Sequence, residues 1–274
     1  MAKNASTNNL SSNSKVRFPD RGLIGVINLA NEKPGTLQYA DGVDAALRIG
    51  DEYRAAGFAA LDLGAQSSHY SVRRMSADEQ VELLAPVIAA LVADGQHITI
   101  ETELSDVIQA CADAGASCIN LSGGAEDTSI LSLIGELELA CITSFTPRDS
   151  PKDVDSIDIA LDLRGQHVER LRGNVQRLTA AGVSQIIVDA GIGYSYQMPY
   201  SEFSRYQVET IRQTRDMGSA LHLPALVAVP RIDNEWLIAA FAALAIESGA
   251  SILRCHDTAV GDVAKLLGFT DIAN

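Results

Sequence analysis

The sequence predicts an α/β protein whose strands and helices alternate in a closed (β/α)8 barrel. Short apolar, β-branched runs alternate eight times with stretches of helical periodicity, and such alternation is typical of parallel strands joined by crossover helices. The 274 residues also suit one barrel of this type. An open, doubly wound sheet is the alternative, but no Gly-rich phosphate loop follows the first strand. We expect residues 1–16, rich in Asn and Ser, to be a disordered tail, and residues 17–274 to form the barrel domain.

The predicted strands are short apolar runs without polar alternation, which indicates burial on both faces. In chain order they span residues 22–28, 59–63, 98–101, 117–121, 139–143, 183–189, 224–229 and 251–255. The helices are predicted at residues 43–56, 76–93, 104–114, 128–133, 159–181, 203–217, 235–248 and 260–267. Gly57 and Gly115 are typical helix stops, and Ser76 with Glu79 forms a capping-box pattern. Gly165 is a candidate break in the fifth helix.

Composition and charge exclude several classes of function. A hydrophobic content of 47% with 20% charged residues describes an ordinary soluble protein, and no apolar run approaches the ~20 residues of a membrane span. The net charge of −14 argues against a nucleic-acid partner. Residues 1–14 lack the apolar region of a secretion signal. The four cysteines, without metal-ligand spacing, are expected to be buried free thiols, and we expect a cytoplasmic protein.

Polar side chains stand at the ends of several predicted strands. Asn28, Glu101, Asn120, Asp189 and His256 each occupy such a position. A helix cap alone explains Asp189, and a loop residue that bonds its own backbone explains Asn120. Helix caps do not favour Glu and His, however, and the carboxyl ends of barrel strands meet at one mouth. We therefore expect a shared polar site there.

Five segments of the chain carry a resemblance to a known family. They are Ile24-Gly-Val-Ile-Asn28, Leu61-Asp-Leu-Gly64, Gly115-Ala-Ser-Cys-Ile-Asn120, Asp189-Ala-Gly-Ile-Gly193 and Arg254-Cys-His-Asp257. In order and spacing they resemble dihydropteroate synthase, from about residue 22 to the end of the chain. The resemblance implies a pterin-binding TIM barrel of folate biosynthesis. The family is a transferase that joins a dihydropterin methyl pyrophosphate to p-aminobenzoate and releases pyrophosphate, with magnesium.

The same resemblance implies roles for individual residues. The pterin would be bound by Glu101, Asn120 and Asp189, and the catalytic groups would be Asp189, Arg254 and His256. The anion or the acceptor would be bound by Asn28, Ser68, His69, Arg231, Arg254 and His256. Asn28 would also lie near a magnesium ion, and no nucleotide cofactor is expected. The partner would be a small pterin or folate.

The sequence departs from the family pattern in the charge and the length of three side chains. Glu101 stands where the family has an aspartate, Ile232 where it has a pterin-binding lysine, and His69 where it has an arginine. Two positively charged side chains of the family pattern are therefore replaced at the mouth of the site. A pyrophosphate needs several positive groups to offset its charge. We interpret this as a preference for a less anionic ligand, with ordinary synthase activity weak or altered.

Two other functions fit the same residues. One is a non-catalytic, pterin-binding or regulatory paralogue, which the lost cations favour. The other is a methyltransferase that acts on methyltetrahydrofolate, although the retained Arg254-Cys-His256 run does not suit it. The apolar helix around residues 236–246 is explained either by a homodimer interface or by core packing.

Overall fold

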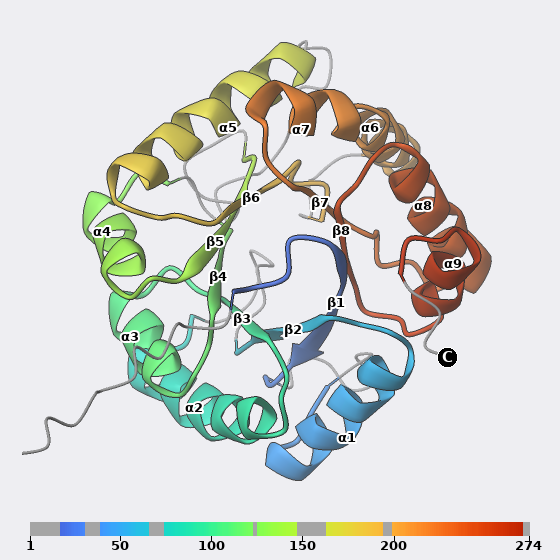
Figure 1. Cartoon of the computed structure of the whole chain (residues 1–274). Coiled ribbons are helices and arrows are strands. Elements are labelled where there is room, and N and C mark those ends of the chain that lie inside the picture. Colours follow the sequence, from blue (N-terminus) through green and yellow to red (C-terminus); the bar gives the residue numbers. More distant parts are fainter. Residues whose placement is uncertain are drawn as a thin grey trace, which may run out of the picture.

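A computed structural model describes residues 17–30, 39–65, 74–122, 125–146, 163–193 and 199–270. Eight parallel strands close into a barrel in sequence order, with β8 paired to β1, and the helices form a ring around it (Figure 1). The strands are β1 (Gly22–Asn28), β2 (Ala60–Gly64), β3 (Ile98–Glu101), β4 (Cys118–Leu121), β5 (Ala140–Ser144), β6 (Ile186–Asp189), β7 (Ala225–Ala228) and β8 (Ile252–Cys255). The predicted TIM barrel is confirmed.

The helices follow the strands as crossover connections. They are α1 (Val43–Ala55), α2 (Ala77–Ala93), α3 (Ser105–Asp113), α4 (Thr128–Glu136), α5 (Leu163–Ala180), α6 (Tyr200–Arg212), α7 (Thr214–Leu221), α8 (Glu235–Glu247) and α9 (Val260–Leu266). The capping box at the start of α2 is confirmed, because Ser76 Oγ accepts from Glu79 N and Ser76 N donates to the Glu79 carboxylate. None of the helices in the described ranges is long and apolar enough to cross a membrane.

The predicted helix over residues 203–217 is wrong. The structure has two helices there, because α6 ends at Arg212 and α7 begins at Thr214. Thr214 Oγ1 donates to the carbonyl of Ile211 at 2.7 Å, a local bond that competes with the regular helical ladder. The proposed break at Gly165 is also wrong, because α5 continues through it. The expected tail at 1–16 and the first residues of the fifth predicted helix, 159–162, lie outside the described ranges.

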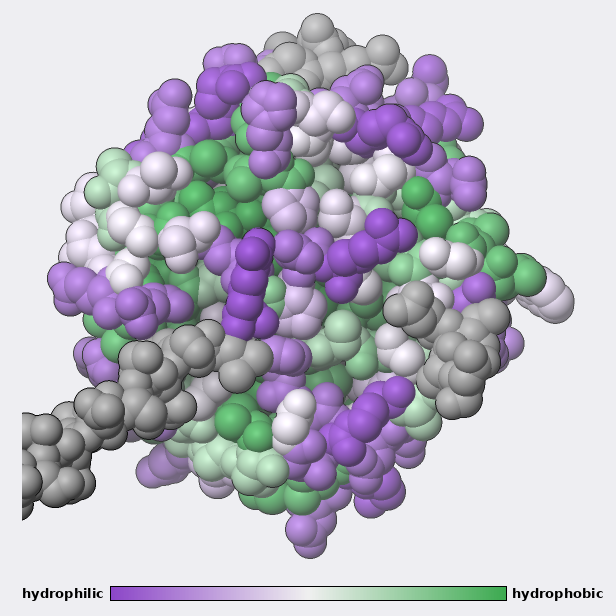
Figure 2. Space-filling view, in the orientation of Figure 1, coloured by the Kyte–Doolittle hydropathy of each residue, from purple (hydrophilic) through white to green (hydrophobic). Residues whose placement is uncertain are grey.

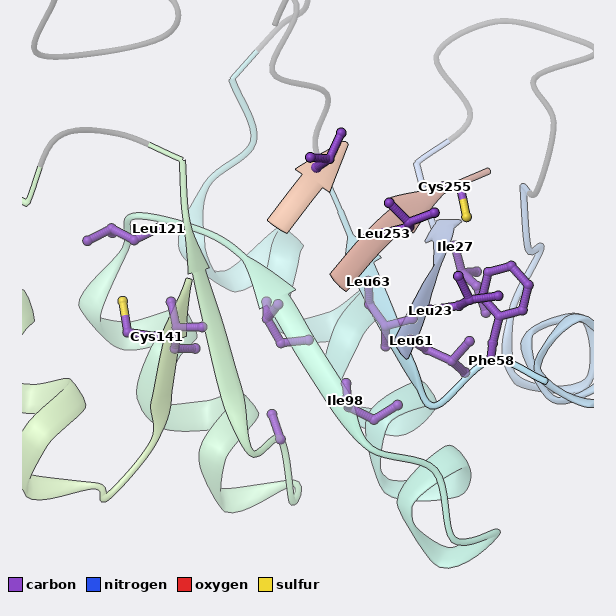
Figure 3. Packing of buried hydrophobic residues seen from close by; sticks show 14 of the residues in the cluster. Leu23, Ile27, Phe58, Leu61, Leu63, Ile98, Leu121, Cys141, Leu253 and Cys255 are labelled. Carbon is purple, nitrogen blue, oxygen red and sulfur yellow. The ribbon is translucent and has the colours of Figure 1, made fainter. Parts of the chain in front are cut away.

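Side chains of alternate strand residues build two apolar layers. The larger one lies between the barrel wall and the helices; Figure 3 shows part of it, with Leu61 and Leu63 of β2 beside Leu23 and Ile27 of β1. The free thiols of Cys111, Cys141 and Cys255 belong to this layer. The smaller layer fills the barrel and consists of Phe18, Ile24, Ala60, Cys118, Ala140, Ile142, Ile187, Leu226 and Ile252. Four buried thiols are thus confirmed.

The inner layer changes from apolar to polar along the strands. Because side chains alternate with a period of two, the residue two positions after an inner apolar one faces inward again. Asp62, Asn120, Ser144, Asp189 and Arg254 follow Ala60, Cys118, Ile142, Ile187 and Ile252 in this way. The carboxyl ends of the strands therefore surround a polar cup that stands on an apolar floor.

Phe18 closes the opposite end of the barrel. Its side chain is 2% exposed and belongs to the inner apolar layer. Its carbonyl accepts from Gln185 Nε2 just before β6, and its ring meets the edge of His97 just before β3. On the face seen in Figure 2, hydrophilic and hydrophobic residues are intermixed.

Candidate functional site

Asp62 is the centre of the hydrogen-bond network in the cup. Its Oδ2 accepts from Arg254 Nε at 2.5 Å and from Asn120 Nδ2 at 3.1 Å. The residue is 1% exposed, and its other oxygen, Oδ1, has no hydrogen-bond partner among the described residues. A buried carboxylate is costly unless it is paired, so the guanidinium is the main compensation for this charge. Asp62 thereby holds the side chains of Arg254 and Asn120, two residues of the predicted site, in position.

Arg254 joins Asp62 to a second carboxylate. Its Nη2 donates to Glu101 Oε2 at 3.0 Å, and both of these side chains are 17% exposed. Burial disfavours the charged guanidinium, but the charges of Asp62 and Glu101 outweigh burial and raise the pKa of Arg254. Arg254 is therefore a permanent cation held between carboxylates.

Asp189 ends β6 with both oxygens occupied by protein donors. Oδ2 accepts from Ser144 Oγ at 3.0 Å, and Oδ1 accepts from the backbone N–H of Gly191 at 3.0 Å. Gly191 has a φ of 73°, which suits glycine. Burial raises the pKa of the Asp189 carboxyl, whereas these two bonds and the charge of Arg254 partly oppose the rise. The carboxylate is thus oriented, and each oxygen keeps a further lone pair for a ligand donor.

His256 and Arg231 lie at the β7–β8 side of the same mouth. Burial, together with the smaller effects of the Arg254 and Arg231 charges, lowers the pKa of His256 to about 3. His256 Nδ1 is buried without a hydrogen-bond partner in the described part of the chain. Arg231, in contrast, is exposed. At neutral pH His256 therefore carries no charge.

Acidification is expected to destabilise the protein through His256. The folded pKa lies below the unfolded value of about 6.5, so the unfolded chain binds the proton first and stability falls as pH drops from 6.5 towards 3. From pH 6.5 to 5, the free energy of unfolding should fall by about 2 kcal/mol from this group. Urea titrations of the wild type and His256→Gln across this range measure it. An equal pH dependence in the two proteins would contradict the prediction.

Asn28 lies at the end of β1, beside Gly64 of β2. Its Oδ1 is 3.9 Å from the position that a Cβ on Gly64 would occupy. The described residues contain no group of three His, Cys, Asp or Glu side chains that could hold a metal. One amide oxygen supplies a single ligand, whereas magnesium takes six and usually receives several from water and phosphate. Asn28 therefore fits a magnesium ion only as a minor contributor.

The structure brings most of the predicted site residues to one mouth. Arg254 bonds directly to Glu101 and is linked to Asn120 through Asp62, and the charge of Asp189 acts on Arg254. Ser68 and His69 lie outside the described residues. Ile232 is half-buried and packs against the outer apolar layer.

Asp62 is not among the site residues predicted from the sequence. The signal was present, because a carboxylate interrupts an apolar run in Ala60-Leu-Asp-Leu. A charged residue within a strand that is otherwise buried on both faces needs a buried partner. In a barrel, that partner comes from another strand's inward position.

Comparison with known proteins places this geometry in a family. Residues 24–256 match the family described as pterin binding enzyme, so the chain belongs to that family. Within it, the chain is similar to dihydropteroate synthases: to that of Neisseria meningitidis at 23% identity, over 89% of this chain and 90% of the relative, and to that of Mycobacterium leprae at 27% identity, over 63% and 62%.

Solved structures show the same fold. A dihydropteroate synthase from Coxiella burnetii in complex with pteroic acid has a TM-score of 0.75 at 21% identity, covering 92% of this chain and 93% of that one. The enzyme from Thermus thermophilus in complex with 6HMPPP has a TM-score of 0.71 at 22% identity, over 90% and 93%. The chain spans 50% of the length of the bifunctional folate synthesis protein of Pisum sativum, to which it is 24% identical over 86% of its own residues.

Proposed function

We propose that the chain binds a dihydropterin in the polar cup and is a divergent transferase of folate biosynthesis, with reduced activity at the pterin methylene. The observation that carries the proposal is Asp189, a carboxylate 6% exposed and oriented by Ser144 and Gly191. A pterin presents adjacent N–H donors on its amino-pyrimidine edge, and a fixed carboxylate accepts two of them. Membership of the pterin binding family supports the same ligand.

The neighbouring groups supply the remaining polarity. Asn120 is 5% exposed, and its carboxamide is oriented because Nδ2 donates to Asp62. Its carbonyl oxygen would accept from a ligand donor, and a site of this kind rejects ligands that leave its buried groups unpaired. In the transfer reaction, an aromatic amine nitrogen would bond to the methylene carbon, the carbon–oxygen bond to pyrophosphate would break, and the amine would lose a proton.

Three groups at or beside the cup, among the described residues, offer little to stabilise the pyrophosphate that would leave. Arg254 is engaged by two carboxylates, His256 is neutral, and Ile232 packs into the apolar layer. Transition-state charge on a leaving group needs preorganised cations or donors. We therefore propose weak activity with the ordinary substrate. The position of Ile232 favours the second candidate function, a non-catalytic pterin-binding or regulatory paralogue.

Two measurements test the proposed function. Titration calorimetry of the full chain with hydroxymethyl-dihydropterin should detect binding at micromolar concentration or tighter, and Asn120→Ala should weaken it about tenfold through one lost hydrogen bond. Rescue of a strain without its own dihydropteroate synthase would support the transferase. Tight binding without rescue would support the non-catalytic paralogue, and absence of binding would refute both.

Metal removal is expected to leave pterin binding unchanged. Magnesium would depend on Asn28 and on phosphate oxygens of a ligand, and an unphosphorylated pterin brings none. The dissociation constant of hydroxymethyl-dihydropterin should therefore change less than about twofold between EDTA and millimolar magnesium. A larger gain of affinity with magnesium would show that the cup holds the ion itself.

We also propose that the protein is a cytoplasmic homodimer that buries the outer face of α8. Trp236 is 86% exposed and Leu237 42%, and α8 carries apolar residues on all sides, as in helices that are buried all round. In Figure 2 hydrophobic residues gather at the edge beside α8. Light scattering should give twice the mass of 29.1 kDa for the wild type. Trp236→Glu should give the monomer mass, while Glu247→Gln at the end of the same helix should remain dimeric.

A further inference from the structure

An ion pair crosses the mouth of the barrel between two strands that are not neighbours. Glu101 ends β3 and Arg254 lies in β8, with β1 and β2 between them in the barrel order. Their side chains nevertheless meet at 3.0 Å. The contact depends on the length of the Glu101 side chain, because its carboxylate is one methylene further from the backbone than an aspartate carboxylate would be. The pair lies beside Asp62, the buried centre of the network.

The pair engages the positive charge of Arg254 before any ligand arrives. Arg254 and Arg231 bring guanidinium groups to this part of the mouth, and Asp62, Glu101 and Asp189 bring carboxyl groups. Arg254 already interacts with all three carboxyl groups. A multiply charged anion that approached Arg254 would meet like charges at short range in a low-dielectric site, where their repulsion is strong.

We propose that Glu101 is a specificity-determining residue: it occupies Arg254 in place of a ligand anion, so the cup takes dihydropterins without a phosphate ester and discriminates against the pyrophosphate ester. This inference rests on the proposed function, because it names the substrate class of the same cup. Glu101 acts on the anion through Arg254 and is thus a positioning residue as well as a source of repulsion. The uncharged pterin edge still meets Asp189 and Asn120.

The experiment compares two ligands in one protein. Calorimetry of the full chain, in EDTA, gives dissociation constants for hydroxymethyl-dihydropterin and for its pyrophosphate ester. The wild type should bind the unphosphorylated form at least about tenfold more tightly. Glu101→Gln keeps the length of the side chain and removes its charge, so the affinity ratio should move towards the ester by about tenfold. Glu101→Asp, too short to reach Arg254, should move the ratio in the same direction.

A matched control separates local from overall charge. Glu136→Gln removes the same charge at the exposed last residue of α4, at the barrel end opposite the mouth, and should leave the ratio unchanged. The ratio is the decisive reading, because a merely structural defect weakens both ligands together. A wild type that binds the ester more tightly overturns the inference while the pterin cup stands. A ratio equal in Glu101→Gln and the wild type overturns it too, and binding of neither ligand refutes the proposed function as well.

Discussion

Asp189→Asn is expected to weaken binding of hydroxymethyl-dihydropterin about a hundredfold, because two charge-assisted hydrogen bonds to the ligand are lost or weakened. The amide retains one acceptor, which Gly191 N–H or Ser144 can still use, but its NH2 group faces the ligand donors. Calorimetry measures the loss. Asp51→Asn on the exposed side of α1 removes the same charge and should bind as the wild type does.

The same substitution is expected to stabilise the fold at neutral pH. The folded pKa of Asp189 is raised by burial, so the folded protein keeps the proton longer and stability falls as pH rises from about 4 through the folded pKa. Asparagine has no such penalty. The free energy of unfolding of Asp189→Asn minus that of the wild type, measured in urea, should thus increase as the pH rises. A variant that loses stability relative to the wild type above pH 5 would refute this.

Asp62→Ala is expected to lower the free energy of unfolding by about 3 kcal/mol, because removal of one partner leaves a buried charge uncompensated. Arg254 would keep Glu101 only, and Asn120 Nδ2 would lose its acceptor. Pterin affinity should fall as well, since both groups lose their orientation. Urea unfolding and calorimetry give the two readings.

A double variant identifies the cause of that loss. Asp62→Ala with Arg254→Met removes both charges and should recover about 1 kcal/mol or more of the stability lost by Asp62→Ala alone. If the two single losses simply add, the pair contributes nothing beyond its separate residues, and the central role given to Asp62 is wrong.

Local sequence signals predicted the barrel and the strand ends well. Alternation of strand and helix, and the positions of Asn120 and Asp189 at strand ends, follow from periodicity over a few residues. The hydrogen-bond network in the cup does not follow from such local signals. Arg254 reaches partners that are 192 and 153 residues away along the chain, and only closure of the barrel brings them together. The break between α6 and α7 escaped prediction because no Gly or Pro stands between Arg212 and Thr214 to signal it.

A carboxylate inside a strand, such as Asp62, is harder to predict as a site residue than one at the end of a strand. Asp62 does not stand at the end of its strand, where polar residues signal a site, but two positions before the end of β2 on its inward side. Register relative to the neighbouring strands decides which residue faces the cup. That register comes from pairing between strands, such as Asp62 with Val26 of β1 and Thr99 of β3.

Within the described residues, the ring of Phe18 closes the end of the barrel opposite the mouth. Its side chain completes the apolar floor, and Gln185 donates to its backbone carbonyl. A heterocycle bound in the cup, as we propose, would place one edge among the buried polar groups and direct its opposite end towards the mouth. A bulky group on that opposite end would therefore be tolerated far better than one on the buried edge.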